Sequence, residues 1–286
     1  MALQMLISGL LLGGMYALIA SGFSIVNGVM KLFNFSHGAF VMLGAYVTFW
    51  STVKLGINPI LSIPISMILM FAIGYIVQKY IINLIVKAPT YMTLILTFGL
   101  NMLLVNIALV LWTGDVRSTP MPLAGMRLNL YGASIPVIRL IAFIISILVT
   151  IILNLMMGKT SFGRSINAAR MDLDAAKLVG VNISNTYALT FGIGTALAGC
   201  AGSLIAMVGA ISPSMASLYS IKAFAICILG GSGSMMGPLV GGIIIGLLET
   251  FGVAVLGAGY QEAVSFSVLL ILLIFRPKGI FGKELY

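Results

Sequence analysis

The sequence contains few charged groups. Only 7% of its 286 residues are Asp, Glu, Lys or Arg, whereas about a quarter of the residues in a typical soluble domain are charged. With 60% hydrophobic residues, the chain cannot cover itself with an ordinary water-facing surface. Uncharged apolar runs long enough to cross about 30 Å of hydrocarbon recur along it. We therefore predict a polytopic membrane protein whose spans are helices, because a helix satisfies its own backbone hydrogen bonds in lipid.

Metal-binding and catalytic side chains are also scarce. The chain has one His, two Cys and six acidic residues, and none of them cluster at ligand spacing, so we expect no metal and no other cofactor. The segment Gly158-Lys-Thr ends like a Walker A motif, but Leu153 stands where its first glycine belongs. We do not expect an enzyme. The basic residues lie singly between apolar runs, which argues for membrane topology and against nucleic acid as a partner.

The predicted fold class is all-α, with a single transmembrane domain over residues 1–286. The first apolar run has no basic residue before Lys31, so we expect a retained span and not a cleavable signal peptide. The segment 217–232 is short, contains Lys222 and ends in Gly-Gly, which predicts a broken, tilted or re-entrant helix. Nine spans are expected, near 4–26, 36–53, 59–79, 91–112, 135–157, 186–209, 217–232, 237–256 and 260–276.

The distribution of Lys and Arg predicts the orientation. Short basic loops stay in the cytoplasm, which places two basic segments inside and, by counting spans, puts the N-terminus outside and the C-terminus inside. The loop Thr113–Ser134 then lies outside. The inside segments carry Lys159, Arg164, Arg170 and Lys177 in a loop, and Arg276, Lys278 and Lys283 in the tail.

Small residues occur at GxxxG spacing, which lets helix backbones approach closely in lipid. We favour packing within the chain, and a seam against another subunit is the alternative. The three glycine pairs are Gly9 with Gly13, Gly237 with Gly241, and Gly242 with Gly246.

Five polar residues fall within or beside predicted spans: Asn34, His37, Asn101, Asn106 and Glu249. Polar groups at membrane depth are costly and usually face protein or water. For His37 we weigh a hydrogen bond to a backbone carbonyl against a place in a permeation path. For Glu249 we weigh a protonated or Lys-paired structural acid against a functional one. The chain of acids that a proton relay needs is absent.

Charge is concentrated in one cytoplasmic segment, FGRSINAARMDLDAAKLVG, at residues 162–180. It predicts a short helix pair over Arg164–Val179, ended by Gly180 as a left-handed cap. Two interpretations remain open from physics alone, a helix laid into a groove of a soluble partner and a basic loop held at lipid headgroups. We expect one face to carry Ile166, Ala169, Leu173, Ala176 and Val179.

Asp174-Ala175-Ala176-x-x-x-Gly180 resembles the EAA-x-x-x-G loop of ABC-importer permeases, with Asp174 in place of the usual Glu and without the downstream I-x-L-P. Three further stretches resemble the LivH-type permeases of branched-chain amino-acid ABC transporters. They are GLLLGGMYALIASGFSIVNGVMKLFNFSHGAFVMLGAY, KAFAICILGGSGSMMGPLVGGIIIGLLE and LLILLIFRPKGIFG. Their order and spacing also fit, so the resemblance covers nearly the whole chain.

The resemblance implies the membrane half of an ATP-driven importer in a bacterial or archaeal cytoplasmic (inner) membrane. Its expected partners are a second homologous permease, two ATP-binding subunits that hydrolyse the ATP, and an extracytoplasmic substrate-binding protein. The cargo implied is a branched-chain or other hydrophobic amino acid. Urea, short amides and aromatic or carboxylate compounds are the alternative cargo, because similar permeases handle them. A proton- or sodium-coupled carrier using Glu249, and an oligomeric scaffold, are the remaining alternatives.

The resemblance also assigns expected roles to residues. The ATPase-coupling loop spans 158–184 and includes Gly163, Arg164, Ala169, Asp172, Asp174, Ala175, Ala176 and Gly180. Asn34-Phe35-Ser36-His37-Gly38 matches an N-F-[AS]-H-G signature. This signature and the polar residues in the predicted spans together give the candidate translocation path, which is Asn34, Ser36, His37, Asn101 and Glu249. The second signature, L-G-G-x-G-S-x-x-G, supplies candidates for a helix break or close packing, namely Gly230, Gly231, Gly233 and Gly237.

Overall fold

The computed structural model describes residues 2–86, 88–123, 125–130, 132–231, 234, 236–275 and 279–280. Within these residues, seven helices are long and apolar enough to cross a membrane. They are α1 (Ala2–Met30), α2 (His37–Leu55), the continuous helix Pro59–Ile85, α5 (Thr90–Trp112), α6 (Val137–Lys159), α9 (Ile183–Val208) and α11 (Gly237–Leu256). The helix Pro59–Ile85 consists of α3 (Pro59–Val77), the π-helical η1 (Gln78–Ile82) and α4 (Asn83–Ile85).

The other two predicted spans are helical but shorter. Helix α10 (Met215–Gly230) has 16 residues and α12 (Gln261–Phe275), which follows the 3₁₀ turn η2 (Ala258–Tyr260), has 15. At 1.5 Å per residue they are about 24 and 22 Å long, less than the hydrocarbon thickness of about 30 Å. All nine predicted segments are therefore helical, while seven of them have the length of a full span.

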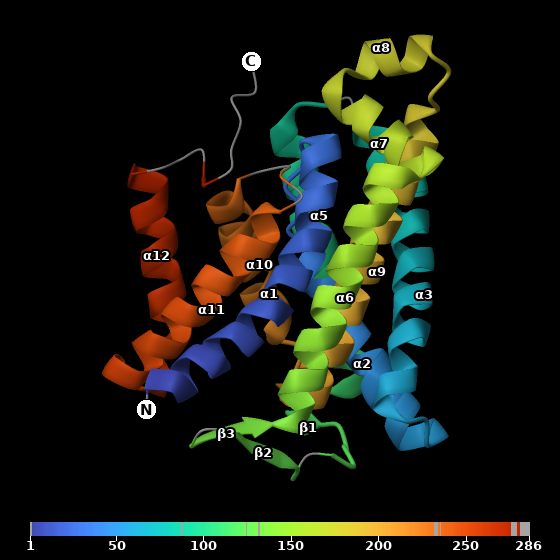
Figure 1. Ribbon diagram of the computed structural model, residues 1–286. Helices are drawn as coiled ribbons and strands as arrows, with labels where there is room; N and C mark the ends of the chain where they lie inside the picture. The colour runs from blue at the N-terminus through green and yellow to red at the C-terminus, as the bar shows by residue number, and fades with distance from the viewer. Residues whose placement is uncertain are drawn as a thin grey trace.

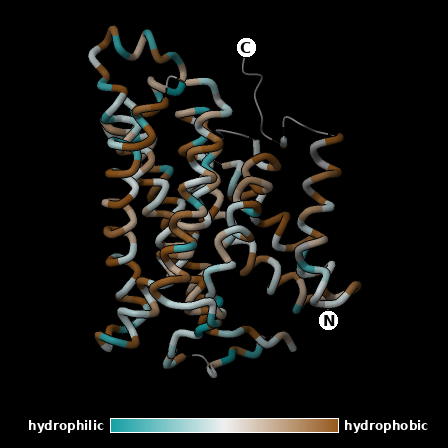
Figure 2. Tube along the Cα trace, turned by 180° about the vertical axis from the view of Figure 1, so that it is seen from behind, coloured by the Kyte–Doolittle hydropathy of each residue, from teal (hydrophilic) through white to brown (hydrophobic). Residues whose placement is uncertain are grey.

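The two ends of the helix bundle differ (Figure 1). The N-terminus lies at one end beside the strands β1, β2 and β3. The short helices α7 (Ser161–Met171) and α8 (Leu173–Leu178) lie at the opposite end, toward which α12 also runs. Hydrophobic residues predominate along the helices between the two ends (Figure 2). This is the arrangement expected of a chain whose helices cross a bilayer.

The protein core lies around α9, which packs against α1, α2 and α3. Glycines let these helices come close: a Cβ added at Gly199 would meet Met70, and one at Gly202 would meet the carbonyl oxygen of Val41. By contrast, α5 and α6 expose rows of large aliphatic side chains. Lipid can solvate such rows, so their exposure needs no further partner.

The GxxxG glycines pack within the chain. A Cβ added at Gly13 would lie 2.7 Å from the Cα of Ile243, and one at Gly246 would lie 2.5 Å from the Cα of Gly13. The α1 and α11 backbones therefore touch without side chains between them. Gly241 packs in the same way against the carbonyl oxygen of Ile226 in α10. Packing within the chain, the interpretation favoured from the sequence, accounts for these glycines.

Four short strands correct the purely helical prediction. The predicted loop Thr113–Ser134 contains β1 (Arg117–Ser118) and β2 (Arg127–Leu130), and β3 (Ala133–Pro136) follows at its end. β2 pairs antiparallel with β3, and β1 pairs with β4 (Ala210–Ile211) directly after α9. Backbone groups that leave a helix need new hydrogen-bond partners, and pairing supplies them. Gly132, at φ +80°, lies in the β2–β3 turn, where positive φ favours glycine.

Candidate functional site

The α7–α8 helix pair is built from local capping signals. Thr160 accepts a hydrogen bond from the backbone N–H of Gly163 at 3.0 Å and so caps α7. Asp172 accepts hydrogen bonds from the N–H groups of Asp174 and Ala175, at 2.8 and 3.0 Å, and so caps α8. These backbone donors, first that of Ala175 and then that of Asp174, hold the pKa of the Asp172 carboxyl below its usual value. The predicted helix pair is present, with its break at Asp172.

Gly180 ends α8 with a left-handed turn, as the sequence predicted. Its φ is +83°, and its N–H donates to the carbonyl of Lys177 at 3.0 Å. The N–H of Val181 donates to the carbonyl of Ala176 at 3.0 Å. The two bonds together form a Schellman motif, which satisfies carbonyls that the end of a helix leaves free.

The predicted contact face of the helix pair is only half correct. Ile166, Ala169 and Ala176 are buried in the chain itself, with 0 to 2% of their surface exposed. Leu173 and Val179, predicted on the same face, are exposed. The break at Asp172 changes the direction of the chain, so one helical periodicity cannot continue across it. The exposed side chains of the pair are thus larger and apolar: Met171, Leu173, Leu178 and Val179.

The remaining residues of the predicted coupling loop differ in exposure. Arg164, Asp172, Asp174 and Ala175 are exposed, and Lys177 forms an ion pair with Asp174 at 2.7 Å. Gly163 is buried, and a Cβ there would lie 2.3 Å from the carbonyl oxygen of Met157. The first turn of α7 therefore rests directly on the end of α6.

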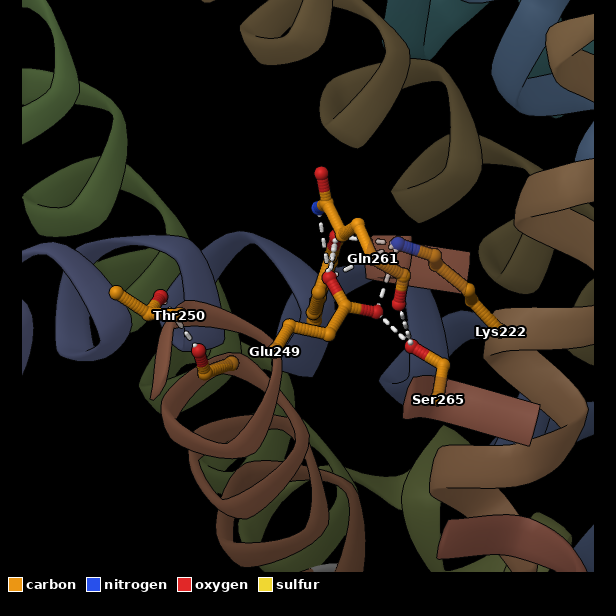
Figure 3. A network of polar contacts seen from close by, with 7 residues as sticks. Lys222, Glu249, Thr250, Gln261 and Ser265 are labelled. Carbon is orange, nitrogen blue, oxygen red and sulfur yellow. Dashed lines mark hydrogen bonds and ion pairs between the residues drawn. The ribbon is translucent and has the colours of Figure 1, made fainter. Parts of the chain in front are cut away.

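A second group of polar residues surrounds Glu249 in the core (Figure 3). Glu249 on α11 is fully buried and lies 2.8 Å from the Nζ of Lys222 on α10. Its carboxylate also accepts hydrogen bonds from Tyr16 of α1 at 2.7 Å and from Gln261 at 2.8 Å, and a further one from Ser265 of α12. Of the two interpretations weighed from the sequence, the geometry is that of a Lys-paired acid. The network joins four helices.

The signature segment 34–38 forms a third polar group. Ser36 donates to the side-chain oxygen of Asn34 from both its backbone N–H and its hydroxyl, at 3.1 and 2.6 Å. The Nε2 of His37 lies 2.9 Å from the carbonyl oxygen of Ile19 on α1 and therefore carries the proton. All three side chains are buried. Gly38 donates its N–H to the hydroxyl of Ser220 on α10 at 2.9 Å.

The two asparagines of α5 have different surroundings. Asn101 is buried, one turn beyond Thr97, whose hydroxyl donates to the carbonyl of Phe33. Asn106 is exposed and donates to the carbonyl of Met102 in its own helix. Among the described residues, no hydrogen bond joins the segment 34–38 or Asn101 to Glu249. The candidate path residues therefore form two separate groups.

The described glycines of the second signature bring the end of α10 against the start of α11. Gly231 ends α10 with φ +90°. A Cβ added at Gly230 would lie 2.2 Å from the carbonyl oxygen of Gly237, so no side chain fits between the two helices here. Gly233 lies outside the described residues, as do the tail residues Arg276, Lys278 and Lys283.

Helix α10 carries two residues that the sequence analysis did not assign to a site. The hydroxyl of Ser220 donates a hydrogen bond to the carbonyl of Phe35 in the segment 34–38. Lys222, two residues further along, donates one to the carboxylate of Glu249. Lys222 could have been found, since a basic residue inside a span calls for an acidic partner. Ser220, Tyr16 and Ser265 gave no such signal, because hydroxyl groups are common in apolar helices.

A bundle of apolar helices of spanning length is the architecture of a multi-pass membrane protein. The family model described as "Branched-chain amino acid transport system / permease component" matches residues 5–275. The chain belongs to this family. The resemblance noted in the sequence is thereby confirmed.

Named relatives match over nearly their whole length. The high-affinity branched-chain amino acid transport system permease protein BraD of Pseudomonas aeruginosa is 35% identical, covering 98% of this chain and 96% of the relative. The corresponding LivH proteins of Salmonella typhimurium and Escherichia coli are each 31% identical with the same coverage. These relatives are named as transport permeases and not as enzymes. No solved structure matches the chain.

Proposed function

We propose that this chain is the permease subunit of an ATP-driven ABC importer for branched-chain or other hydrophobic amino acids. The observation that carries the proposal is the α7–α8 helix pair, which projects from one end of the bundle with an uncovered apolar surface. Its role is to convert closure of the ATPase subunits into a change of membrane-helix packing. ATP is hydrolysed on the partner subunits.

The surface of the helix pair fits a protein partner better than lipid headgroups. Met171, Leu178 and Val179 are 88, 89 and 76% exposed, and they lie on the short helices beyond the end of α6 or directly after them. A headgroup layer favours basic side chains, whereas exposed aliphatic residues beside an Asp–Lys ion pair are suited to a protein groove with a polar rim. We therefore propose that these side chains enter the ATPase groove.

The helix pair is connected to the bundle in a way that transmits force. Ile166 on α7 is fully buried in a cluster with Val29 of α1, Met157 of α6 and Tyr187 of α9. A push on α7 therefore acts on three membrane helices together, because close-packed cores transmit displacement.

Orientation and partners follow from the same assignment. The ATPase subunits lie inside, so α7, α8 and the C-terminal end lie inside and the N-terminus outside, which agrees with the basic residues of the 158–184 loop. A second homologous permease, two ATP-binding subunits and an extracytoplasmic substrate-binding protein complete the importer. The relatives' names support amino acids as the cargo.

Reconstitution tests the proposal. The complex is purified from its native membrane in mild detergent, its subunits are identified, and it is placed in vesicles with its binding protein. We expect ATP-dependent uptake of leucine, isoleucine and valine. Uptake of urea or benzoate in place of these amino acids contradicts the cargo. Uptake by this chain alone without ATP contradicts the importer and favours an ion-coupled carrier.

A further inference from the structure

The chain between α1 and α2 is not helical over residues 31–36. α1 ends at Met30, and Lys31 has φ +50°, in the left-handed region, where the chain turns back. His37, the first residue of α2, then lies with its Nε2 2.9 Å from the carbonyl oxygen of Ile19. Ile19 lies about 16 Å before Met30 along α1, at 1.5 Å per residue. The non-helical segment therefore runs back along α1, and α2 starts inside the membrane.

Non-helical backbone at membrane depth needs hydrogen-bond partners from other parts of the protein. Two hydroxyl groups supply them here. Thr97 of α5 donates to the carbonyl of Phe33 at 3.2 Å, and Ser220 of α10 donates to the carbonyl of Phe35 at 2.7 Å. The N–H of Phe35 also donates to the hydroxyl of Thr97, at 3.4 Å. The segment is therefore held between α5 and α10.

An aromatic surface forms where this segment meets α10. The side chain of Phe35 is 38% exposed. Phe33 and Phe224 of α10 are partly buried, and their rings meet edge to face with centroids 5.5 Å apart. All three residues line one small cavity. We call the surface formed by Phe33, Phe35 and Phe224 the Phe35 face.

An unpaired polar group lies beside the Phe35 face. Asn34 is 1% exposed and lines the same cavity. Its side-chain oxygen accepts hydrogen bonds from Ser36, but among the described residues its amide nitrogen has no partner. The cavity, of about 10 Å³, has room for one water molecule. Lipid tails offer no acceptor for an amide, so this part of the chain is poorly suited to face them.

The exposed side of α6 has a different character. It presents Ile144, Leu148, Ile151 and Leu155 at spacings of three and four residues along a regular helix. A regular helix bonds its own backbone, so lipid alone can cover this side. The Phe35 face instead combines non-helical backbone, an exposed aromatic ring and a neighbouring unpaired amide. These features call for a cover other than lipid.

We propose that the Phe35 face is the interface at which the second permease subunit packs against this chain. The inference rests on the proposed function and adds the location of this contact. Of the expected partners, the ATPase subunits and the binding protein lie outside the membrane, at opposite ends of the bundle. The second permease is the partner whose helices reach the depth of Phe35. A water-filled space beside Phe35 would also need this second membrane chain to separate it from lipid.

Phe35 has the properties of an interface anchor. Its backbone is bonded on both sides, to Thr97 and to Ser220, so the residue loses little conformational freedom when a partner covers its ring. Aromatic side chains that enter a pocket of the partner contribute much of the binding energy of an interface. In a membrane, close packing and hydrogen bonds are what join helices. A fixed, protruding ring serves that packing.

Photo-cross-linking in the assembled complex tests the interface. p-Benzoylphenylalanine replaces Phe35, and the complex is irradiated in its native membrane. We expect an adduct of this chain with the second permease, identified by mass spectrometry. Phe251 on α11 is the matched control, because it is the same residue type with nearly the same exposure, 39% against 38%. The probe at position 251 should form at least about tenfold less of this adduct, because it reacts only with groups in near contact.

Truncation tests the anchor. Phe35→Ala should reduce recovery of the second permease with this chain by at least about tenfold, since an aromatic anchor contributes that much to an interface. Phe251→Ala is the control and should leave the recovery unchanged. Quantitative co-purification in mild detergent measures both. Unchanged recovery with a folded Phe35→Ala chain overturns the proposal. If Phe35→Ala does not fold, the cross-linking comparison still decides.

The cross-linked partner identifies what covers the Phe35 face. An adduct with a homologous permease, or with a second copy of this chain, supports the interface. Adducts with lipid alone, with an ATPase subunit or with the binding protein overturn it, as do equal adducts from positions 35 and 251.

Transport assays separate this inference from the proposed function. If position 35 cross-links to a second permease but the complex transports no amino acid, the cargo is wrong and the interface stands. If the complex takes up leucine with ATP while position 35 reaches lipid alone, the interface is wrong and the function stands.

Discussion

The ammonium nitrogen of Lys222 lies 2.8 Å from one carboxylate oxygen of Glu249, with both side chains almost completely buried. The pair connects α10 to α11 inside the chain. Removing one charge from a buried pair leaves the other uncompensated, which costs about 3–5 kcal/mol. We expect Glu249→Gln to lower the free energy of unfolding by about this amount.

The double variant Lys222→Met/Glu249→Gln removes both charges and should recover much of the lost stability. The measurement is thermal unfolding of the purified complex in detergent. A Glu249→Gln protein that is as stable as the unmodified one but has lost ion-coupled uptake contradicts the structural role and restores the carrier interpretation.

The apolar surface of α8 predicts an effect on assembly. Leu178→Glu places a charge in the proposed ATPase groove and should reduce recovery of the ATPase with the permease by at least about tenfold, since burying an unpaired charge is costly. Leu128→Glu, an exposed leucine on the hairpin at the other end, is the matched control. Quantitative co-purification measures both. Ala176→Glu is not a clean test, because Ala176 is buried inside the chain and the charge would disturb α8 itself. Unchanged ATPase recovery with Leu178→Glu would argue against the docking surface.

The cap of α8 predicts a pH dependence. The pKa of Asp172 is lowered by the backbone N–H groups of Ala175 and Asp174, so the capping bond stabilises α8 at every pH above the ordinary carboxyl value near 4. It is lost only as the pH falls through the lowered pKa. Between about pH 5 and 8, the contribution of Asp172 to the stability of α8 should therefore stay constant.

Substitution tests the same cap at neutral pH. Asp172→Ala should speed hydrogen exchange in the segment 172–180 several-fold, because it removes the acceptor, while Asp172→Asn retains one and should stay near the unmodified rate. Hydrogen exchange measured by mass spectrometry distinguishes them. Equal protection in the alanine and unmodified proteins would show that the cap does not hold α8.

The glycine contact between α1 and α11 predicts a large steric effect. Gly13→Leu forces a side chain into a space where the Cα of Ile243 lies 2.7 Å from the new Cβ. Overpacking of this kind costs about 1–3 kcal/mol or more. Gly99→Leu on α5, where nothing lies within 4 Å, should be nearly neutral. Melting temperatures of the two variants provide the comparison, and similar values would contradict the packing.

Much of the fold could be predicted from the sequence, because apolar runs and charge positions reflect the bilayer directly. The nine helical segments, the break at the Gly-Gly of 230–231 and the left-handed Gly180 each depend on local chemistry. The strands of the 113–136 region could not be predicted, since β1 pairs with a segment about ninety residues away. The face of α7 and α8 was half wrong because capping by Asp172 redirects the chain.

The site was less predictable than the fold. Glu249 and His37 could be recognised from the sequence alone, because a polar residue stands out within an apolar run. Their partners were not visible: Tyr16 and Ser265 come from opposite ends of the chain and meet Glu249 only through tertiary packing.

The backbone contact of α1 with α11 also joins these two helices into one rigid body. Helices that touch through glycine have almost no side-chain layer to rearrange, so α1 and α11 must tilt together as one body. We therefore expect α11 to follow α1 whenever a partner displaces α7, because Ile166 of α7 packs on Val29 of α1.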